Sequence, residues 1–157
     1  MKHLNVCHTV LACAALAVWA PDAMAANESI LGNWQIVEAV AAPWSRPQEQ
    51  AALAAASKRL LNTVVTFAPS SVKSKFKPFD CKSKVIYTPN SIEVDALFQG
   101  NLPEPNPAAA AARLGFPKGE IPSVDVRCLK ALHTFHFRDP DTALFNYDRV
   151  IYTLKRQ

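Results

Sequence analysis

The chain has 157 residues, a length typical of a single domain. Its formal net charge of +4 is a mild excess and excludes the strongly basic surface on which nucleic-acid-binding proteins usually depend. With four glycines in the whole sequence, the chain has no glycine-rich loop of the kind that holds phosphate groups.

Residues 1–25 have the pattern of a secretory signal peptide. Lys2 supplies the positive charge, residues 10–20 form an apolar segment, and Ala23-Met24-Ala25 matches the small-residue cleavage pattern. The apolar segment is shorter than a membrane-spanning helix requires. We therefore predict cleavage after Ala25, export to the bacterial periplasm, and a mature single domain of residues 26–157.

An alternative to this cleavage is lipid attachment at Cys13, because the residues before it loosely match a lipoprotein signal. In such signals the apolar run ends at the cysteine, whereas here it continues to Ala20. The lipoprotein is therefore the less favoured of the two predictions.

Two cysteines, Cys81 and Cys128, remain after the predicted signal peptide. An even pair in an oxidising compartment is typical of a disulfide, and closing a loop of this length contributes roughly 4 kcal/mol. No C-x-x-C spacing is present, and a metal site would need more ligands at closer spacing. We predict a structural Cys81–Cys128 disulfide, no metal and no cofactor.

In the first two thirds of the mature chain, short β-branched and alternating segments surround one alanine-rich helix. Ser45 and Gln48 form a capping-box pattern, and Pro47 suits the first helical turn, so the helix is predicted over residues 46–61. Alternating polarity predicts strands at residues 31–40, 63–67, 72–77, 84–87 and 92–98, with a turn at Pro89-Asn90-Ser91.

The rest of the mature chain begins with a proline-rich loop at residues 100–107. Asn106 as N-cap, Pro107 in the first turn and Gly115 as C-cap predict a short helix at residues 107–114. Strands are then predicted at residues 123–129, 132–137, 143–146 and 149–155. Many short strands with two short helices predict an α+β fold with a mainly antiparallel, barrel-like sheet.

Gly32-Asn33-Trp34, at the start of the first mature strand, resembles the Gly-x-Trp signature of lipocalins and the wider calycin group. The resemblance implies a calycin-like barrel in which the tryptophan plugs the closed end and a basic residue of the last strand packs across its ring. Arg149, Lys155 and Arg156 are the candidates for that residue. The two predicted helices depart from the pattern, because they interrupt the expected up-and-down hairpins.

A lipocalin-like barrel would carry a small apolar ligand inside the sheet, and this is one of two functions that we consider. The candidate ligand-lining residues are Trp34, Ile36, Val65, Phe67, Val126, Phe135 and Phe137. In so small a domain, the same residues can instead fill the core, which is the usual outcome for small barrels.

The other function is binding to another protein, as an inhibitor or immunity-type protein does. The candidate partner-binding residues are a lysine set and three residues of the proline-rich loop, namely Lys73, Lys75, Lys77, Lys82, Lys84, Leu102, Pro103 and Pro105. Lysines at the edge of a sheet also discourage unwanted strand pairing, so the lysine set has a purely structural interpretation. The prolines stiffen the loop and lower the entropy that binding would cost.

Signatures of catalysis are lacking in this sequence. His133 and His136 would point to opposite faces of a strand, Asp139-Pro140-Asp141 is typical of a turn, and no G-x-S-x-G motif is present. We therefore predict an exported, non-enzymatic interaction protein of the bacterial periplasm, with a lipocalin-like carrier as the alternative. Nucleic acid is not expected as a partner, and the oligomeric state stays open.

Overall fold

The computed structural model describes residues 30–157, except for residues 83, 104 and 130. The predicted signal peptide, its cleavage site after Ala25 and the alternative lipid-attachment site Cys13 lie outside the described residues.

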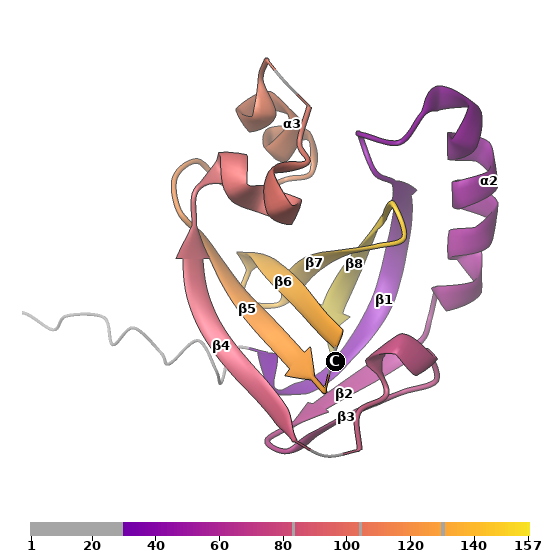
Figure 1. Cartoon of the computed structure of the whole chain (residues 1–157), viewed down its shortest axis with the longest axis vertical. Helices are drawn as coiled ribbons and strands as arrows, with labels where there is room; N and C mark the ends of the chain where they lie inside the picture. The colour runs from indigo at the N-terminus through magenta and orange to yellow at the C-terminus, as the bar shows by residue number, and fades with distance from the viewer. Residues whose placement is uncertain (1–29, 83, 104, 130) are drawn as a thin grey trace, which may run out of the picture.

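The described residues form one sheet of eight antiparallel strands in the order β3-β2-β1-β8-β7-β6-β5-β4. Neighbours in the sheet are neighbours in the chain, except that the first strand pairs with the last, so the sheet is an up-and-down meander that curves into a nearly closed barrel (Figure 1). The predicted α+β fold with an antiparallel, barrel-like sheet is confirmed. The strands are β1 (Gly32–Ala41), β2 (Val64–Ala68), β3 (Ser71–Ser74), β4 (Val85–Ile92), β5 (Ile121–Cys128), β6 (Ala131–Asp139), β7 (Thr142–Tyr147) and β8 (Val150–Arg156).

The gap between β3 and β4, which we call the seam, has no continuous ladder of backbone hydrogen bonds among the residues that the structure describes. Val72 and Cys81 instead form a single antiparallel bridge, with N–H···O distances of 2.8 and 2.7 Å. The sulfur of Cys81 is bonded to Cys128 at the end of β5, as predicted. Farther along the seam, the Tyr87 hydroxyl of β4 donates to the Ala68 carbonyl at 2.7 Å. Cys81 thus joins both sides of the seam, through its backbone and through its sulfur.

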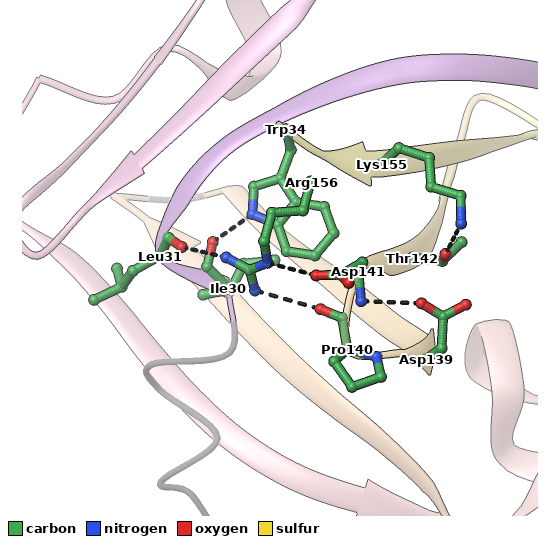
Figure 2. Close-up of polar contacts among 9 residues, drawn as sticks. All are labelled: Ile30, Leu31, Trp34, Asp139, Pro140, Asp141, Thr142, Lys155 and Arg156. Atoms are coloured by element: carbon green, nitrogen blue, oxygen red, sulfur yellow. Dashed lines mark hydrogen bonds and ion pairs between the residues drawn. The ribbon is translucent and has the colours of Figure 1, made fainter.

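One end of the barrel is closed by the expected pair of an indole and a basic residue (Figure 2). Trp34 is fully buried, and its Nε1–H donates to the Ile30 carbonyl at 2.8 Å. The Arg156 guanidinium lies 4.4 Å from the centroid of the indole, where the ring attracts a cation. Arg156 also donates to the Leu31 carbonyl at 2.9 Å and lies 3.2 Å from the Asp141 carboxylate.

The other two basic candidates lie elsewhere. Arg149 is in the turn before β8 and pairs with Glu49 at 2.6 Å, which lowers the pKa of the Glu49 carboxyl. The Lys155 ammonium donates to the Thr142 hydroxyl on β7 (Figure 2). Arg156 is therefore the residue that covers Trp34.

Helices occupy the crossovers and leave the meander intact. The helix α2 (Pro47–Ser57), followed by the 3₁₀ helix η1 (Lys58–Leu60), connects β1 to β2, and α2 packs against β1 and β8 (Figure 1). The predicted Ser45–Gln48 capping box is wrong, because the Ser45 hydroxyl donates to the Arg149 carbonyl at 3.1 Å and α2 has no side-chain cap. The predicted cap of α3 (Pro107–Arg113) is confirmed, since the Asn106 side chain accepts from the Ala109 N–H at 2.8 Å.

Two strand predictions near the seam are wrong. The segment predicted as a strand to residue 77 leaves the sheet after Ser74 and forms the 3₁₀ helix η2 (Lys77–Phe79). The segment predicted as strand, turn and second strand is one strand, β4, which continues through Pro89, followed by the 3₁₀ helix η3 (Val94–Gly100). A proline is tolerated there because β4 is an edge strand, where a missing N–H removes no ladder bond.

The helices η3 and α3 lie on the outer face of the sheet and form a second hydrophobic core with it. In this core, Leu97, Phe98 and Phe116 pack against Leu144 of β7 and Ile151 of β8. The outer face of the central strands is therefore covered, whereas the outer face of β2 and β3 is open. Among the helices of the described part of the chain, none has the length and apolar character needed to cross a membrane.

Replacing both Cys81 and Cys128 with alanine is expected to lower the free energy of unfolding by roughly 4 kcal/mol, because the unfolded chain gains the freedom of the open loop. Urea denaturation of the double variant and of the wild-type protein, with and without a reducing agent, measures this loss. The reduced wild-type protein should match the double variant. A loss below about 1 kcal/mol would show that the seam is held by its backbone contacts alone.

Candidate functional site

The interior of the barrel is filled with aromatic side chains. All seven residues predicted to line a ligand cavity are buried, with Phe67 and Phe135 in edge contact at 5.2 Å between ring centroids. Phe79 enters from η2, and its ring lies 4.6 Å from that of Phe145. The space left between Phe67, Phe79 and Phe135 has a volume of about 10 Å³, no more than one water molecule needs. The seven residues are thus packed as core side chains.

A larger cavity of about 320 Å³, the mouth cavity, lies at the end of the barrel opposite Trp34. It opens between the end of α2 and the β7–β8 hairpin, with mainly apolar walls. Burial, together with the nearby Asp148 carboxylate, raises the pKa of the Tyr152 hydroxyl in its wall. The lining residues are Leu53, Ala56, Arg59, Leu60, Phe76, Tyr147, Asp148, Val150 and Tyr152.

The five lysines of the predicted set all have exposed side chains and lie on β3 or between β3 and β4. Three of them, Lys73, Lys75 and Lys82, border an open groove of about 640 Å³ on the outer face of β2 and β3. Asp80 is the one acidic residue of that groove, and it lies 3.9 Å from the Lys77 ammonium. We call Lys73, Lys75, Lys77, Lys82 and Lys84 the lysine surface.

The proline-rich loop does not extend this surface. Leu102, one of the predicted partner-binding residues, is only 4% exposed, because it is anchored in the second core. Pro103 is half-buried and Pro105 is exposed. The loop leads into α3, at the end of the molecule away from β3 (Figure 1). The predicted partner-binding residues therefore belong to two separate surfaces.

The two histidines of β6 lie on opposite faces of the strand, as their spacing predicts. His133 faces the interior, where its Nε2 lies 3.2 Å from the Pro78 carbonyl and its ring lies 4.5 Å from that of Phe79. Burial lowers the pKa of His133. Because a carbonyl only accepts hydrogen bonds, the proton of the neutral ring is on Nε2.

His136 lies under η3 on the outer face and is 2% exposed. Its Nε2 accepts the Phe98 backbone N–H at 3.2 Å, so the proton of the neutral ring is on Nδ1, which donates to the Ser123 hydroxyl at 2.9 Å. The Ser123 hydroxyl in turn donates to the Ile121 carbonyl at 3.2 Å. Burial lowers the pKa of His136 to about 4, and the Asp125 carboxylate opposes this only in part.

Beside His136 is a cavity of about 220 Å³ that sequence reasoning missed. The Asp125 carboxylate in its wall accepts from the Thr134 hydroxyl at 2.6 Å and from the Asn90 amide at 3.4 Å. The side-chain oxygens of Asn90 and Asn146 are buried and have no hydrogen-bond partner among the described residues. We call this the acceptor cavity, and its lining residues are Asn90, Ile92, Ala96, Phe98, Gln99, Asp125, Leu132, His133, Thr134, His136 and Asn146.

The cover of the acceptor cavity has a strained backbone. Phe98 and Gln99 have φ angles of 52° and 64°, in the left-handed region, and Gly100 follows with 72°. For residues other than glycine this conformation costs about 1–2 kcal/mol each. The alternating pattern of their strands already places Asp125 and Thr134 on the outward face. Asn90 was predicted to lie in a turn, so its position beside them was missed. Local sequence patterns also do not show which strands are neighbours or which segment covers the cavity.

Among the residues that the structure describes, no three histidine, cysteine, aspartate or glutamate side chains come together as metal ligands would. Comparison of the chain with known protein families, curated proteins and solved structures finds no match. The resemblance to calycins therefore rests on the residues discussed above.

The stability of the protein should fall as the pH is lowered from about 6.5 to about 4. In this range His136 stays neutral in the folded protein but binds a proton in the unfolded chain, whose pKa is the ordinary 6.5. The loss between pH 7.5 and pH 4.5 should be roughly 2–3 kcal/mol, as measured by urea denaturation at the two pH values. His133 acts in the same direction. In a His136→Asn variant the fall should be much smaller, and an equal fall in both proteins would contradict this role of His136.

Proposed function

We propose that the protein is an exported, non-enzymatic interaction protein that uses the lysine surface to bind an acidic surface of another protein. An inhibitor or immunity-type protein acts in this way. The observation that carries the proposal is the set of five exposed lysines on and after β3, three of which border an open groove whose lining includes one acidic residue, Asp80.

The structural interpretation of these lysines explains only part of the set. Lys73 and Lys75 lie on or beside the edge strand β3, where lysines discourage pairing with other chains. However, Val72 already has its backbone N–H and carbonyl bonded to Cys81, so this edge is partly covered. Lys82 and Lys84 lie after that bridge in the chain. They are not on β3, so protection of its edge from pairing with other chains does not explain their charge. Clustered like charges of this kind accelerate association with a surface of opposite charge.

The test is a charge reversal of three residues that border the groove, Lys73→Glu, Lys75→Glu and Lys82→Glu together. The tagged wild-type protein is used to isolate its partner from periplasmic extract at low salt, and affinities are then measured with the purified pair. We expect at least about tenfold weaker binding for the variant, because like charges across an interface cost several kcal/mol. Wild-type binding should also weaken as salt is added.

The matched control reverses three exposed cations elsewhere, Lys58→Glu, Arg113→Glu and Lys118→Glu, with the same change in net charge. This control should bind like the wild-type protein, and thermal unfolding should show that both variants are folded. Partner binding that is unchanged in the groove variant and insensitive to salt would overturn the proposal. Retention on anionic polysaccharide or lipid, without a protein at fixed ratio, would assign the surface to a different kind of partner.

A second candidate function, the carrying of a small amphipathic ligand, is supported by the mouth cavity. Its volume of about 320 Å³ is at the lower end of the range for small-molecule sites. Leu53, Leu60 and Phe76 give it an apolar wall, and the side chains of Arg59 and Asp148 supply polar groups at its rim. Because Phe79 and its neighbours fill the barrel, a ligand would bind at this end and not deep in the interior.

Filling the mouth cavity tests this second function. Ala56→Phe is expected to abolish the fluorescence gain of an anilinonaphthalene sulfonate probe, because the new ring occupies the cavity from an exposed position on α2. Ala55→Phe is the matched control, since Ala55 is exposed on the same helix but does not line the cavity. Equal probe binding by the wild-type protein and both variants would contradict a site at the mouth.

A further inference from the structure

The side-chain groups of the acceptor cavity that can still form hydrogen bonds are mainly oxygen atoms, which accept them. Asp125 carries a negative charge and, among the described residues, forms no ion pair with a lysine or arginine. A carboxylate can accept about four hydrogen bonds. Asp125 accepts two, from Thr134 and Asn90. An anion would be repelled from such a cavity, whereas a cation with hydrogen-bond donors would be attracted.

The orientation of the Asn90 amide follows from its contact with Asp125. A carboxylate accepts and does not donate, so the group that faces Asp125 is the amide nitrogen of Asn90. The amide oxygen of Asn90 is then the atom left without a partner. On β7, Asn146 lies two residues beyond Leu144, which pairs with His136, and its side chain lines the same cavity. Its oxygen also lacks a partner among the described residues.

The rest of the wall is apolar. Ile92 of β4, Leu132 of β6 and the ring of Phe98 line the cavity beside the polar groups. The volume of about 220 Å³ suits a short alkyl chain with one polar end and is small for a larger ligand.

We propose that the acceptor cavity binds a primary alkylammonium group. Three N–H donors of the ammonium match the Asp125 carboxylate and the side-chain oxygens of Asn90 and Asn146, and the alkyl chain lies against Ile92 and Leu132. This site is on the outer face of the barrel. It depends neither on the lysine surface nor on the mouth cavity, so it can fail or succeed independently of the proposed function.

Binding requires the cover of the cavity to move, because both amide oxygens are buried in the present conformation. The left-handed turn at Phe98 and Gln99 lines the same cavity as these two asparagines. Such strain persists only where the surroundings enforce it, and the Phe98 N–H bond to His136 and the Asn101 bond to the Phe98 carbonyl at 2.6 Å do so. In the proposed binding step this turn moves, which relaxes its backbone and opens the cavity to the ammonium group.

Titration of the protein, expressed from the full sequence, with propylammonium chloride tests the proposal by NMR. We expect saturable shifts of the backbone amides of Asn90, Gln99 and Asn146, with a dissociation constant in the millimolar range. Tetramethylammonium has the same charge and no N–H donor, and it should cause no saturable shifts. Absence of saturation with propylammonium up to about 50 mM, or an equal response to tetramethylammonium, would overturn the proposal.

Two variants locate the site. Asn146→Ala removes an oxygen that has no partner among the described residues, so it should leave the unfolding midpoint unchanged or raise it, and it should weaken binding at least about threefold. Asp125→Asn removes the charge and should abolish measurable binding. Glu93→Gln removes an exposed charge outside the cavity and is the matched control, with unchanged affinity. Wild-type affinity in a folded Asn146→Ala variant would place the ammonium elsewhere and refute the assignment.

The natural source of the ammonium group is either a free amine or a lysine side chain of a partner. The affinity of acetyl-lysine amide, whose side-chain ammonium is free, is compared with that of propylammonium to distinguish these two sources. At least about tenfold tighter binding of the lysine derivative supports a protein partner, and tighter binding of the simple amine supports a metabolite. Equal affinity for the two compounds would show that the site recognises the alkylammonium group and nothing more of the ligand.

Discussion

Cys81 is the residue on which closure of the barrel depends. Strands β3 and β4 are the two edges of the sheet, and they are not joined by a ladder of backbone bonds. The backbone of Cys81 pairs with Val72 of β3, and its sulfur is bonded to Cys128 of β5, the neighbour of β4. One residue thus fixes both edges. The segment between β3 and β4 is consequently held across the seam, so that η2 directs Phe79 into the interior while the lysines stay in solvent.

Insertion of Phe79 decides what the barrel can do. Its ring contacts Phe135, Phe145 and His133, so the space that a calycin-like carrier would offer is occupied by the chain itself. A filled interior contributes stability through burial of apolar surface, but it leaves binding to the outside of the molecule. The candidate sites accordingly lie at the mouth, at the seam and on the outer face. The up-and-down sheet and the closed end, where Arg156 covers Trp34, keep the arrangement that the sequence resemblance implies.

The features that could be predicted from sequence depend on local chemistry or on a strong pairing rule. The disulfide followed from two cysteines in a chain expected to be exported, and the cap of α3 followed from Asn106 and Pro107. The cation–π pair of Trp34 with a basic residue of the last strand was implied by the resemblance to calycins and not by local chemistry. The errors came from long-range context. Pro89 is typical of a turn, and it lies within a strand only because β4 is an edge. Nothing local marks Phe98 and Gln99 as left-handed, since tertiary contacts impose that conformation.

The outer layer formed by η3 and α3 buries polar side chains of the strands that it covers. In an up-and-down barrel the outer face is usually solvated, so polar residues at outward positions need no special partners. Here the layer buries that face, and His136 is satisfied by the Phe98 N–H and Ser123, whereas the side-chain oxygens of Asn90 and Asn146 have no partner among the described residues. An unsatisfied buried acceptor costs about 1–3 kcal/mol, and the left-handed turn above adds to this cost. A layer kept for packing alone would be more stable with apolar residues at these two positions. The unsatisfied oxygens and the strained turn are the features on which the proposed alkylammonium site rests.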